Sequence, residues 1–431
     1  MLRPVEEKKQ KNWFKLDNAA KIYPAANTKR WSGMFRLSVT LKEKVDSFIL
    51  QEALATTIKR FPSFNIRMRR GLFWYYFETN ARKRPTVRPD INNPCAPISW
   101  QDNNGFLLRV FYYDKRIAID YFHSLTDGTG AMVFLKTLVA QYLKLKGYEI
   151  PAKEGILDVD EQPDIEEFED SFAKYADSKQ RGRAKEPKAY HMKSTKLNDN
   201  DISIITGITS LEKIKQLAKK NNSTITEFLS ALLLYSFYKQ KEKEGLYTKP
   251  TRIAVSIPVN LRNYFKSNTK RNFSLFLNPG IDTILGEYTF EEMLRQIQYF
   301  MKANLNKKTL NAMMTQNVII EKYIFIRVAP LFLKNFLMSI AHSTIGYRPI
   351  STLLSNVGSV TLPCEMQEHV NRFEFILGAA KIRTPYLAVV SYNDTLVLNF
   401  TSKIKETDIE RFFFTYLIKQ GIPVKIESNR E

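Results

Sequence analysis

The sequence contains few cysteines and few histidines. Cys95 and Cys364 are the only two cysteines among 431 residues, and they form no CxxC pair, so neither a disulfide framework nor a zinc knuckle is expected. None of the four histidines is spaced from another as a metal-ligating pair, and no HExxH motif is present. We therefore expect no metal cofactor, and a reducing, cytoplasmic setting.

Glycine-based motifs and long apolar runs are also missing. The chain has no GxxxxGK[ST] phosphate loop, no GxGxxG turn and no GxSxG nucleophile elbow. Residues 318–341 form the most apolar segment, but Pro330 and four charged residues interrupt it, whereas a membrane-spanning helix needs about 20 nearly uncharged residues. The first residues carry both charge signs ahead of any apolar run, unlike a secretory signal. These absences predict a soluble protein.

Positive charge is in excess. The formal net charge is +21 at pH 7, and the basic residues are spread along the chain rather than gathered in one tail. Such a protein attracts phosphate groups, whether in nucleic acid, at an anionic membrane face or on a co-substrate such as coenzyme A. No zinc-finger spacing, RNP-type aromatic strand or bZIP heptad accompanies the charge, so we do not expect a nucleic-acid partner.

One shift in composition suggests how the chain is divided. Residues 154–170 contain nine acidic and no basic residues, and residues 174–196 then contain eight basic ones. A charge block of this kind is typical of a solvated crossover between packed units. We predict an N-terminal subdomain over residues 1–175, a crossover linker over residues 176–205 and a C-terminal subdomain over residues 206–431, each subdomain long enough to form its own core.

Apolar periodicity predicts a mixture of helices and strands, so the predicted fold class is α/β. In the N-terminal half, helices are expected over residues 47–60 and 130–145, and strands over 72–77, 107–113 and 116–123. In the C-terminal half, we expect helices over 211–220, 225–239 and 408–419, strands over 252–258 and 353–363, and a hairpin of 386–392 and 395–401 around Asn393-Asp394. Thr224 and Glu227 predict a capping box at the start of the helix 225–239.

One short segment has the residues for acid–base chemistry. In Tyr121-Phe-His-Ser-Leu-Thr-Asp-Gly-Thr-Gly130, His123 ends an apolar strand, and Asp127 and Gly128 form the turn before a helix. A histidine can accept a proton from an alcohol or amine as that group attacks a carbonyl, and a strand end holds the ring firmly. Asp127 would fix the turn if its carboxylate faced a cation, and Gly128 would permit a close backbone approach or a positive φ.

The same residues also fit a purely structural role. A single histidine at the end of a strand is commonly a hydrogen-bonded structural residue, and Asp-Gly is a frequent turn dipeptide. The residues by themselves leave both interpretations open.

The sequence HSLTDG at residues 123–128 matches the HxxxDG motif and resembles the chloramphenicol acetyltransferase-like superfamily. Within it, the chain is most similar to bacterial alcohol acetyltransferase-like and polyketide-associated acyltransferase-type proteins. The similarity covers most of the chain: it includes the opening segment Trp13–Pro24, the first helix and following strand at residues 54–67, the second-domain strand IPVNLR at 257–262 with Asn272-Phe273, and the later strand SNVG at 355–358.

This resemblance implies an α+β sandwich of two pseudo-related subdomains, each built on a mixed sheet, with a tunnel at their interface. It implies that His123 is the general base. It also implies that Asp127 and Gly128 are structural residues at the active site, with Asp127 bonded to an arginine that corresponds to Arg262.

Ser355 and Asn356 belong to the strand that resembles the interface strand of the family. A hydroxyl or amide there would bind the oxyanion or the substrate, or would only satisfy the end of a strand. The sequence leaves both interpretations of Ser355 and Asn356 open.

The function implied by the resemblance is transfer of an acetyl or other acyl group from acyl-CoA, such as acetyl-CoA, to the hydroxyl of a small or lipophilic alcohol, or to an amine. No metal and no covalent enzyme intermediate is required.

Two alternatives to this function stay open. One is condensation-domain-like transfer from a thioester on an acyl carrier protein, whose acidic surface would dock on the basic chain. The other is a non-catalytic member of the family that binds acyl chains or a membrane.

The apolar residues 324–340 have three interpretations. A buried helix is the commonest, a lid over the tunnel is the second, and a helix on a membrane surface is the third. In the third interpretation Arg327 and Lys334 would face lipid headgroups, so peripheral membrane contact is part of the hypothesis.

Overall fold

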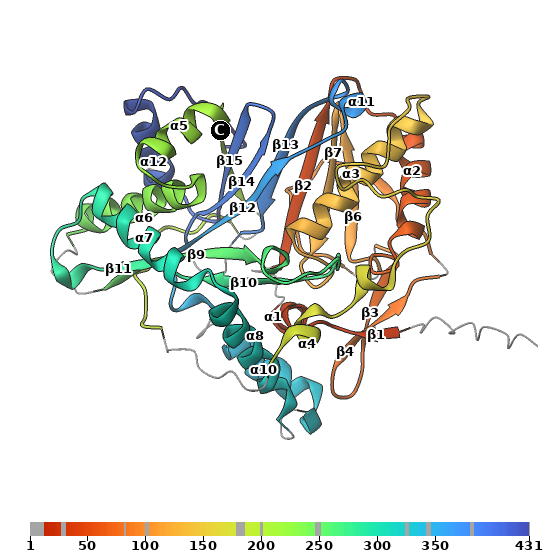
Figure 1. Ribbon diagram of the computed structural model, residues 1–431, viewed down its shortest axis with the longest axis horizontal. Coiled ribbons are helices and arrows are strands. Elements are labelled where there is room, and N and C mark those ends of the chain that lie inside the picture. The colour runs from red at the N-terminus through yellow and green to blue at the C-terminus, as the bar shows by residue number, and fades with distance from the viewer. Residues whose placement is uncertain are drawn as a thin grey trace, which may run out of the picture.

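The computed structural model describes residues 13–26, 32–81, 83–99, 103–177, 186–198, 201–245, 251–323, 327–341, 346–379 and 383–430. Two large mixed sheets with helices packed against them make up most of the molecule (Figure 1). Residues 178–185 and 199–200 of the predicted linker, and residues 324–326 of the apolar segment, lie outside the described residues.

The first large sheet has five strands in the order β13-β2-β7-β6-β5. Its neighbouring strands are antiparallel except for β5 and β6, which are parallel. The strands are β2 (Met34–Leu41), β5 (Val87–Pro89), β6 (Leu108–Tyr113), β7 (Arg116–Phe122) and β13 (Val370–Leu377). Helices α2 (Ser47–Arg60) and α3 (Gly128–Leu145) contact each other beside this sheet. Nearly every residue of the two central strands β2 and β7 is buried, which explains their high content of apolar residues.

The second large sheet has eight strands, in the order β10-β9-β12-β14-β15-β8-β16 with β11 paired to β9. Strand β12 is parallel to both β9 and β14, and the other pairs are antiparallel. The strands are β8 (Ser203–Ser210), β9 (Arg252–Asn260), β10 (Ser274–Leu277), β11 (Gly280–Asp282), β12 (Thr352–Val360), β14 (Tyr386–Tyr392), β15 (Thr395–Ser402) and β16 (Lys425–Ser428).

Four helices accompany the second sheet: α5 (Leu211–Lys220), α6 (Ile225–Lys243), α7 (Phe290–Asn304) and α12 (Asp408–Lys419). The long helix α6 contacts α5, α7, α12 and strand β9, and most of its residues are buried. It is therefore apolar on almost every side, as expected for a helix enclosed by other elements.

The path of the chain links the two sheets. Strand β12 belongs to the second sheet, β13 pairs with β2 of the first sheet, and β14 returns to the second sheet. In Figure 1, β13 lies between β2 on one side and β12 and β14 on the other. The first hydrophobic core accordingly includes Phe373, Phe375 and Val390 from the C-terminal part of the chain. The predicted division at residues 176–205 stays a prediction.

Smaller elements complete the described structure. A third sheet of three strands has the order β1-β4-β3. These elements are β1 (Trp13–Lys15), β3 (Ile66–Arg70) and β4 (Tyr75–Thr79), with the helices α1 (Ile22–Ala26), α4 (Ser171–Tyr175), α8 (Lys307–Lys322), α10 (Leu331–Ala341) and α11 (Cys364–Gln367). Helix α10 packs on α1, and α8 packs on α4.

Most of the elements predicted from periodicity are confirmed. The helices at residues 47–60, 211–220 and 408–419 coincide with α2, α5 and α12. The capping box of Thr224 and Glu227 is present at the start of α6. The predicted hairpin is formed by β14 and β15, with Asn393 at a φ of 51° in its turn.

One predicted strand is displaced in the structure, and the apolar region is divided between two helices. The strand expected at residues 72–77 runs from Tyr75 to Thr79, because the amide of Gly71 donates to the carbonyl oxygen of Trp74 at 3.0 Å and closes a turn over residues 71–74. The apolar region 318–341 is divided between α8, which ends at Lys322, and α10, which begins directly after Pro330. No helix within the described ranges is long and apolar enough to cross a membrane.

Candidate active site

The HxxxDG segment forms the turn between β7 and α3. His123 directly follows β7, and its backbone amide donates to the carbonyl oxygen of Gly33 at 2.9 Å. Asp127 is the N-cap of α3, with Oδ1 accepting from the amide of Gly130 at 3.1 Å. The N-cap bond fixes where the helix begins, and therefore also fixes the turn that carries the histidine.

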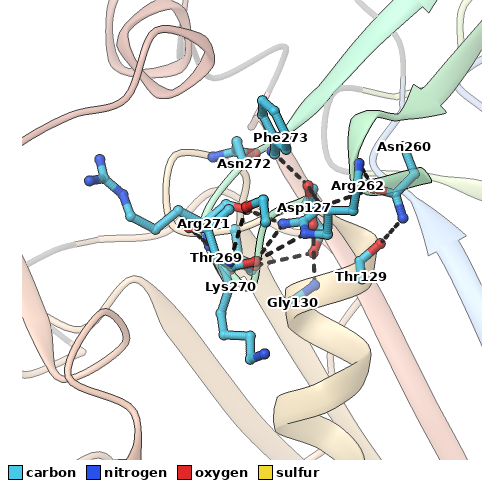
Figure 2. A network of polar contacts seen from close by, with 12 residues as sticks. Asp127, Thr129, Gly130, Asn260, Arg262, Thr269, Lys270, Arg271, Asn272 and Phe273 are labelled. Carbon is cyan, nitrogen blue, oxygen red and sulfur yellow. Dashed lines mark hydrogen bonds and ion pairs between the residues drawn. The ribbon is translucent and has the colours of Figure 1, made fainter. Parts of the chain in front are cut away.

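The Asp127 carboxylate points toward Arg262 (Figure 2). Its Oδ2 accepts from Nη1 of Arg262 at 2.8 Å and from the backbone amide of Phe273 at 2.8 Å. Arg262 lies in the single 3₁₀ turn Leu261–Asn263 that follows β9, rather than in the predicted strand itself. The structure therefore brings together Asp127 and Arg262, two residues that are 135 positions apart in the sequence.

Arg262 is fixed by several further acceptors. Its Nε and Nη2 donate to the carbonyl oxygen of Thr269 at 3.0 and 2.9 Å, and Nη2 also donates to that of Arg271 at 2.6 Å. Nη1 lies 3.2 Å from Oδ1 of Asn260, whose Nδ2 donates to Thr129 at the start of α3. The guanidinium thus holds the 269–271 segment, the end of β9 and the HxxxDG turn in one network.

Two glycines let this turn approach its neighbours closely. A Cβ on Gly130 would collide with the carbonyl oxygen of Lys270 and with Oγ1 of Thr126, which itself donates to that carbonyl at 2.6 Å. A Cβ on Gly128 would lie 2.9 Å from Cγ1 of Val357 in β12. Gly128 begins α3 and is not among the glycines with positive φ, so close approach is the reason for glycine there.

The His123 imidazole lies between aromatic rings and one amide. It stacks on Tyr23 of α1 at a centroid distance of 4.6 Å and an interplanar angle of 5°, and it lies 4.9 Å from the ring of Phe35 in β2. Its Nδ1 lies 3.2 Å from Oδ1 of Asn272, just before β10. The ring is therefore held from the first sheet, from α1 and from the second sheet at once.

Burial lowers the pKa of His123 below its ordinary value of 6.5, and the nearby Asp127 and Asn272 offset only part of this effect. The neutral imidazole is consequently favoured at pH 7. When Oδ1 of Asn272 accepts a hydrogen bond from Nδ1–H, the lone pair of the imidazole is on Nε2. A neutral imidazole with a lone pair on Nε2 can accept a proton.

A buried carboxylate lies behind Asn272. Oδ1 of Asp17 accepts from the amide of Ala20 at 2.8 Å, and Oδ2 is 3.4 Å from Nη2 of Arg271. Burial raises the pKa of Asp17 to about 6, against the opposing effects of Arg271 and the Asn272 side chain. Within the described chain, Nδ2 of Asn272 makes no hydrogen bond of standard geometry, but the nearby Asp17 carboxylate favours the amide orientation in which Oδ1 faces His123.

Ser355 and Asn356 lie in β12, where the pairing with β14 shifts register between residues 356 and 359. Nδ2 of Asn356 donates to Oγ1 of Thr226 at 3.1 Å, and its Oδ1 accepts from the amide of Gly358 at 2.8 Å. The Asn356 side chain therefore stabilises the irregular end of β12 and links it to α6. Ser355 is partly buried opposite Ala388 of β14.

Sequence reasoning missed several residues around His123. The sequence places Asn272 next to a family-like strand and Tyr23 in the opening segment, and it indicates a role for neither. Phe35, Asp17 and the glycine at position 130 were not singled out. The one usable signal was local: Gly130 lies two residues after Gly128 in the first turn of a helix, where glycine is otherwise unfavourable.

Two hollows on the described surface lie away from His123. One of about 340 Å³ lies between α6 and α12 and is lined by residues that include Lys239, Lys243 and Arg411. The other, of about 300 Å³, is lined by residues that include Glu154, Ser359 and Tyr392. The predicted interface tunnel stays a prediction.

Within the described ranges, no group of three or more His, Cys, Asp or Glu side chains is placed to hold a metal ion.

Comparison with protein families settles the wider class. The family model described as alcohol acetyltransferase matches residues 168–393, which is more than half of the chain. The chain belongs to the alcohol acetyltransferase family. It is therefore an acyltransferase of the chloramphenicol acetyltransferase-like type, as the HxxxDG resemblance implied. The comparison with curated proteins found no match to this chain.

Solved structures show the same fold at low sequence identity. The trichothecene 15-O-acetyltransferase of Fusarium sporotrichioides is 12% identical, with 94% of each chain covered and a TM-score of 0.60. Polyketide synthase associated protein 5 of Mycobacterium tuberculosis is also 12% identical, with 94% of this chain and 96% of that chain covered and a TM-score of 0.60. A variant of the starter condensation domain of rhizomide synthetase, in complex with C8-CoA, is 12% identical, with 94% of each chain covered and a TM-score of 0.58. The predicted two-subdomain, mixed-sheet fold class is thereby confirmed.

Proposed function

We propose that this protein transfers an acetyl or other acyl group from acyl-CoA to the hydroxyl of a small or lipophilic alcohol, with His123 as the general base. The observation that supports this function most directly is the 3.2 Å contact between Nδ1 of His123 and Oδ1 of Asn272. It leaves the basic nitrogen Nε2 for the acceptor alcohol.

In the proposed reaction, Nε2 of His123 takes the hydroxyl proton of the acceptor as the acceptor oxygen attacks the thioester carbonyl carbon. A tetrahedral intermediate forms, in which the former carbonyl oxygen carries negative charge. The intermediate collapses with cleavage of the carbon–sulfur bond, and the imidazolium returns its proton to the departing sulfur. The products are the ester and the free thiol of coenzyme A, so protons and electrons balance without a metal.

The aromatic rings beside His123 suit a reaction that must exclude water. Tyr23 covers one face of the imidazole, and Phe35 lies close to another side. Apolar walls reduce the access of water, which would otherwise compete with the alcohol for the thioester. This environment and the net charge of +21, which attracts the phosphates of coenzyme A, are the features that fit the proposed co-substrate.

Asp127 has a positioning role in this proposal. Its carboxylate is bound by Arg262, Phe273 and Gly130, so it holds the turn rather than accepting the proton of His123. For the oxyanion, we favour Ser355 over Asn356, because the Asn356 amide already donates to Thr226. One hydroxyl aimed at the developing charge would lower the barrier by about 2.7 to 4 kcal/mol.

The test is release of free thiol from acetyl-CoA and longer acyl-CoA donors in the presence of pooled alcohols. His123→Ala should lower kcat by about 100-fold or more, because general-base catalysis typically contributes that much. The matched control is His369→Ala, since the His369 ring contacts that of Tyr148 at a tilt of 44° and lies outside the site. Equal rates for wild type and His123→Ala, across every alcohol that serves as acceptor, would overturn the proposed base.

The same assay separates the two alternatives. A rate that depends on an acidic acyl carrier protein as thioester donor, with acyl-CoA inactive, would favour condensation-like transfer. No transfer with any donor, together with saturable binding of acyl-CoA, would favour a non-catalytic role.

A further inference from the structure

Helix α10 presents its apolar side to solvent. Phe332, Phe336 and Leu337 are 68%, 63% and 53% exposed, and Leu333 is 41% exposed. Residues at positions i, i+1, i+4 and i+5 lie on one side of a helix, so these four side chains form one continuous strip. The usual arrangement of a surface helix, with its polar side outward, is reversed here.

The polar side of α10 is turned inward. Nζ of Lys334 donates to the carbonyl oxygen of Phe73 at 2.8 Å and lies 3.8 Å from the ring centroid of Trp74, and the lysine is only 3% exposed. Nδ2 of Asn335 donates to the hydroxyl of Tyr75 at 3.0 Å. The expectation that Lys334 faces lipid headgroups is therefore wrong, because a carbonyl oxygen and an aromatic ring bind its ammonium group inside the protein.

The apolar strip continues onto neighbouring segments. The amide of Leu331 donates to the carbonyl oxygen of Leu72 at 2.9 Å, which attaches the turn between β3 and β4 to the start of α10. Leu72 is 82% exposed, Phe73 is 46% exposed and Val328 is 57% exposed. The α10 surface is defined here as these three residues and the four of the helix: Leu72, Phe73, Val328, Phe332, Leu333, Phe336 and Leu337. In Figure 1, α10 and the β3–β4 turn both lie at the lower edge of the molecule.

Exposed arginines adjoin the α10 surface in sequence. Arg70 precedes the turn that carries Leu72, and Arg327 directly precedes Val328, and both are exposed. The described acidic side chains Glu78 and Glu321 are each paired with basic side chains of the same protein. An apolar surface beside cationic side chains is the pattern that binds an anionic lipid layer.

We propose that the α10 surface docks on an anionic lipid layer, with the seven apolar side chains in the headgroup and acyl boundary and Arg70 and Arg327 at the lipid phosphates. A second copy of the chain fits less well, since two molecules that each carry +21 would meet with their arginines opposed.

The docking surface is close to the proposed active site. Helix α10 packs on α1, and α1 carries Tyr23, which stacks on the His123 imidazole. A docked protein would thus hold the site near a lipophilic alcohol dissolved in the lipid. This connection rests on the proposed function, whereas the docking itself does not.

The test uses the full chain in flotation with vesicles of phosphatidylcholine, alone or mixed with phosphatidylglycerol. Wild type should float with the mixed vesicles. The double variant Phe332→Asp with Phe336→Asp should lower the partition coefficient by about tenfold or more, because two large apolar side chains are replaced by anions. Both sites are exposed, so the substitutions leave the packed core intact.

The matched control is Ile284→Asp with Leu285→Asp, which changes two residues that are 63% and 77% exposed next to β11, on another part of the molecule. This control should float like wild type. Flotation of the α10 variant equal to that of wild type, or no flotation of wild type, would overturn the proposal. A dimer in lipid-free sedimentation that the α10 variant converts to monomer would assign the surface to a second copy instead.

Vesicle binding is measured without substrate, so its failure and that of the proposed function are distinct. A protein that floats but releases no thiol would keep the docking surface and lose the proposed function. A protein that transfers acyl groups but never floats would keep the proposed function and lose the docking surface.

Discussion

Nδ1 of His123 lies 3.2 Å from Oδ1 of Asn272, and this contact links segments that adjoin the two large sheets. His123 follows β7 of the first sheet, and Asn272 precedes β10 of the second. The amide therefore sets both the orientation of the imidazole and the nitrogen that carries the proton.

Asn272→Ala should lower kcat by about 10- to 100-fold, by analogy with the loss of a group that orients a functional histidine. The KM for acyl-CoA should change little, because the proposed role of Asn272 is to orient the base. Steady-state kinetics of thiol release would measure both quantities. Asn221→Ala is the control, since Asn221 donates to Leu217 at the end of α5. A raised KM with unchanged kcat would contradict the positioning role.

The acid limb of the pH profile should lie below pH 6.5, the ordinary pKa of histidine, because burial lowers the pKa of His123. The proposed base acts when it is neutral, so kcat/KM should be constant near neutral pH and fall as the pH falls through the lowered pKa. Measurement of kcat/KM from about pH 5 to 8 would locate the limb. A limb above pH 6.5 would mean that the imidazolium is stabilised in the free enzyme.

The lowered pKa of His123 also makes the stability of the fold depend on pH. The unfolded chain protonates His123 at a higher pH than the folded chain does, so this group stabilises the fold above pH 6.5 and its contribution is lost as the pH falls. Acid unfolding of His123→Gln should begin at lower pH than that of wild type.

Arg262→Ala should destabilise the protein by roughly 3 to 5 kcal/mol, because it leaves the largely buried Asp127 carboxylate without its cation. Chemical denaturation would measure the change in the free energy of unfolding. Lys243→Ala is the control, since the Lys243 side chain is 69% exposed and its pairing with Asp408 should contribute about 1 kcal/mol or less. An unchanged free energy of unfolding for Arg262→Ala would mean that the bridge does not stabilise the fold.

Gly130→Ala should be more destabilising than Gly128→Ala. The added methyl at position 130 meets the carbonyl oxygen of Lys270, which is backbone and cannot move aside, whereas at position 128 it meets a side-chain methyl of Val357. Overpacking of this kind costs about 1 to 3 kcal/mol. Comparison of the two free energies of unfolding makes each variant the control for the other. A larger effect at Gly128 would contradict the close approach at Gly130.

Two kinds of signal predicted parts of the site: local apolar periodicity and the family resemblance. The strand, turn and helix around His123 follow from apolar periodicity, and the resemblance pointed to Arg262 as the partner of Asp127. Asn272 carries no such signal, because it meets His123 across 149 positions and through packing of two sheets. No local pattern encodes that contact.

Lys334 is a residue for which the expectation from the sequence is wrong. A lysine in an apolar helix is normally expected to reach solvent. Here the carbonyl oxygen of Phe73, 261 positions away, and the ring of Trp74 bind its ammonium group, so the helix is turned with its apolar side outward. Which side of α10 faces inward depends on the β3–β4 turn, and helical periodicity alone could not reveal it.

A buried glutamate in α12 should make the protein less stable at alkaline pH. Glu410 is 2% exposed, and within the described chain its Oε2 has no hydrogen-bond partner. Burial raises the pKa of Glu410 from 4.5 to about 7. Between these two pH values the folded state keeps a proton that the unfolded chain releases, so stability falls as the pH rises through this window.

Glu410→Gln removes this effect and should raise the free energy of unfolding above pH 7 by at most about 3 kcal/mol, with little gain near pH 4.5. Denaturant titrations at the two pH values would measure the difference. Glu212→Gln is the control, because the Glu212 side chain is 57% exposed at the start of α5. If Glu410→Gln were equally stabilising at both pH values, packing rather than ionisation of the carboxyl would be the cause. A loss of stability at alkaline pH would show instead that the ionised carboxylate stabilises α12.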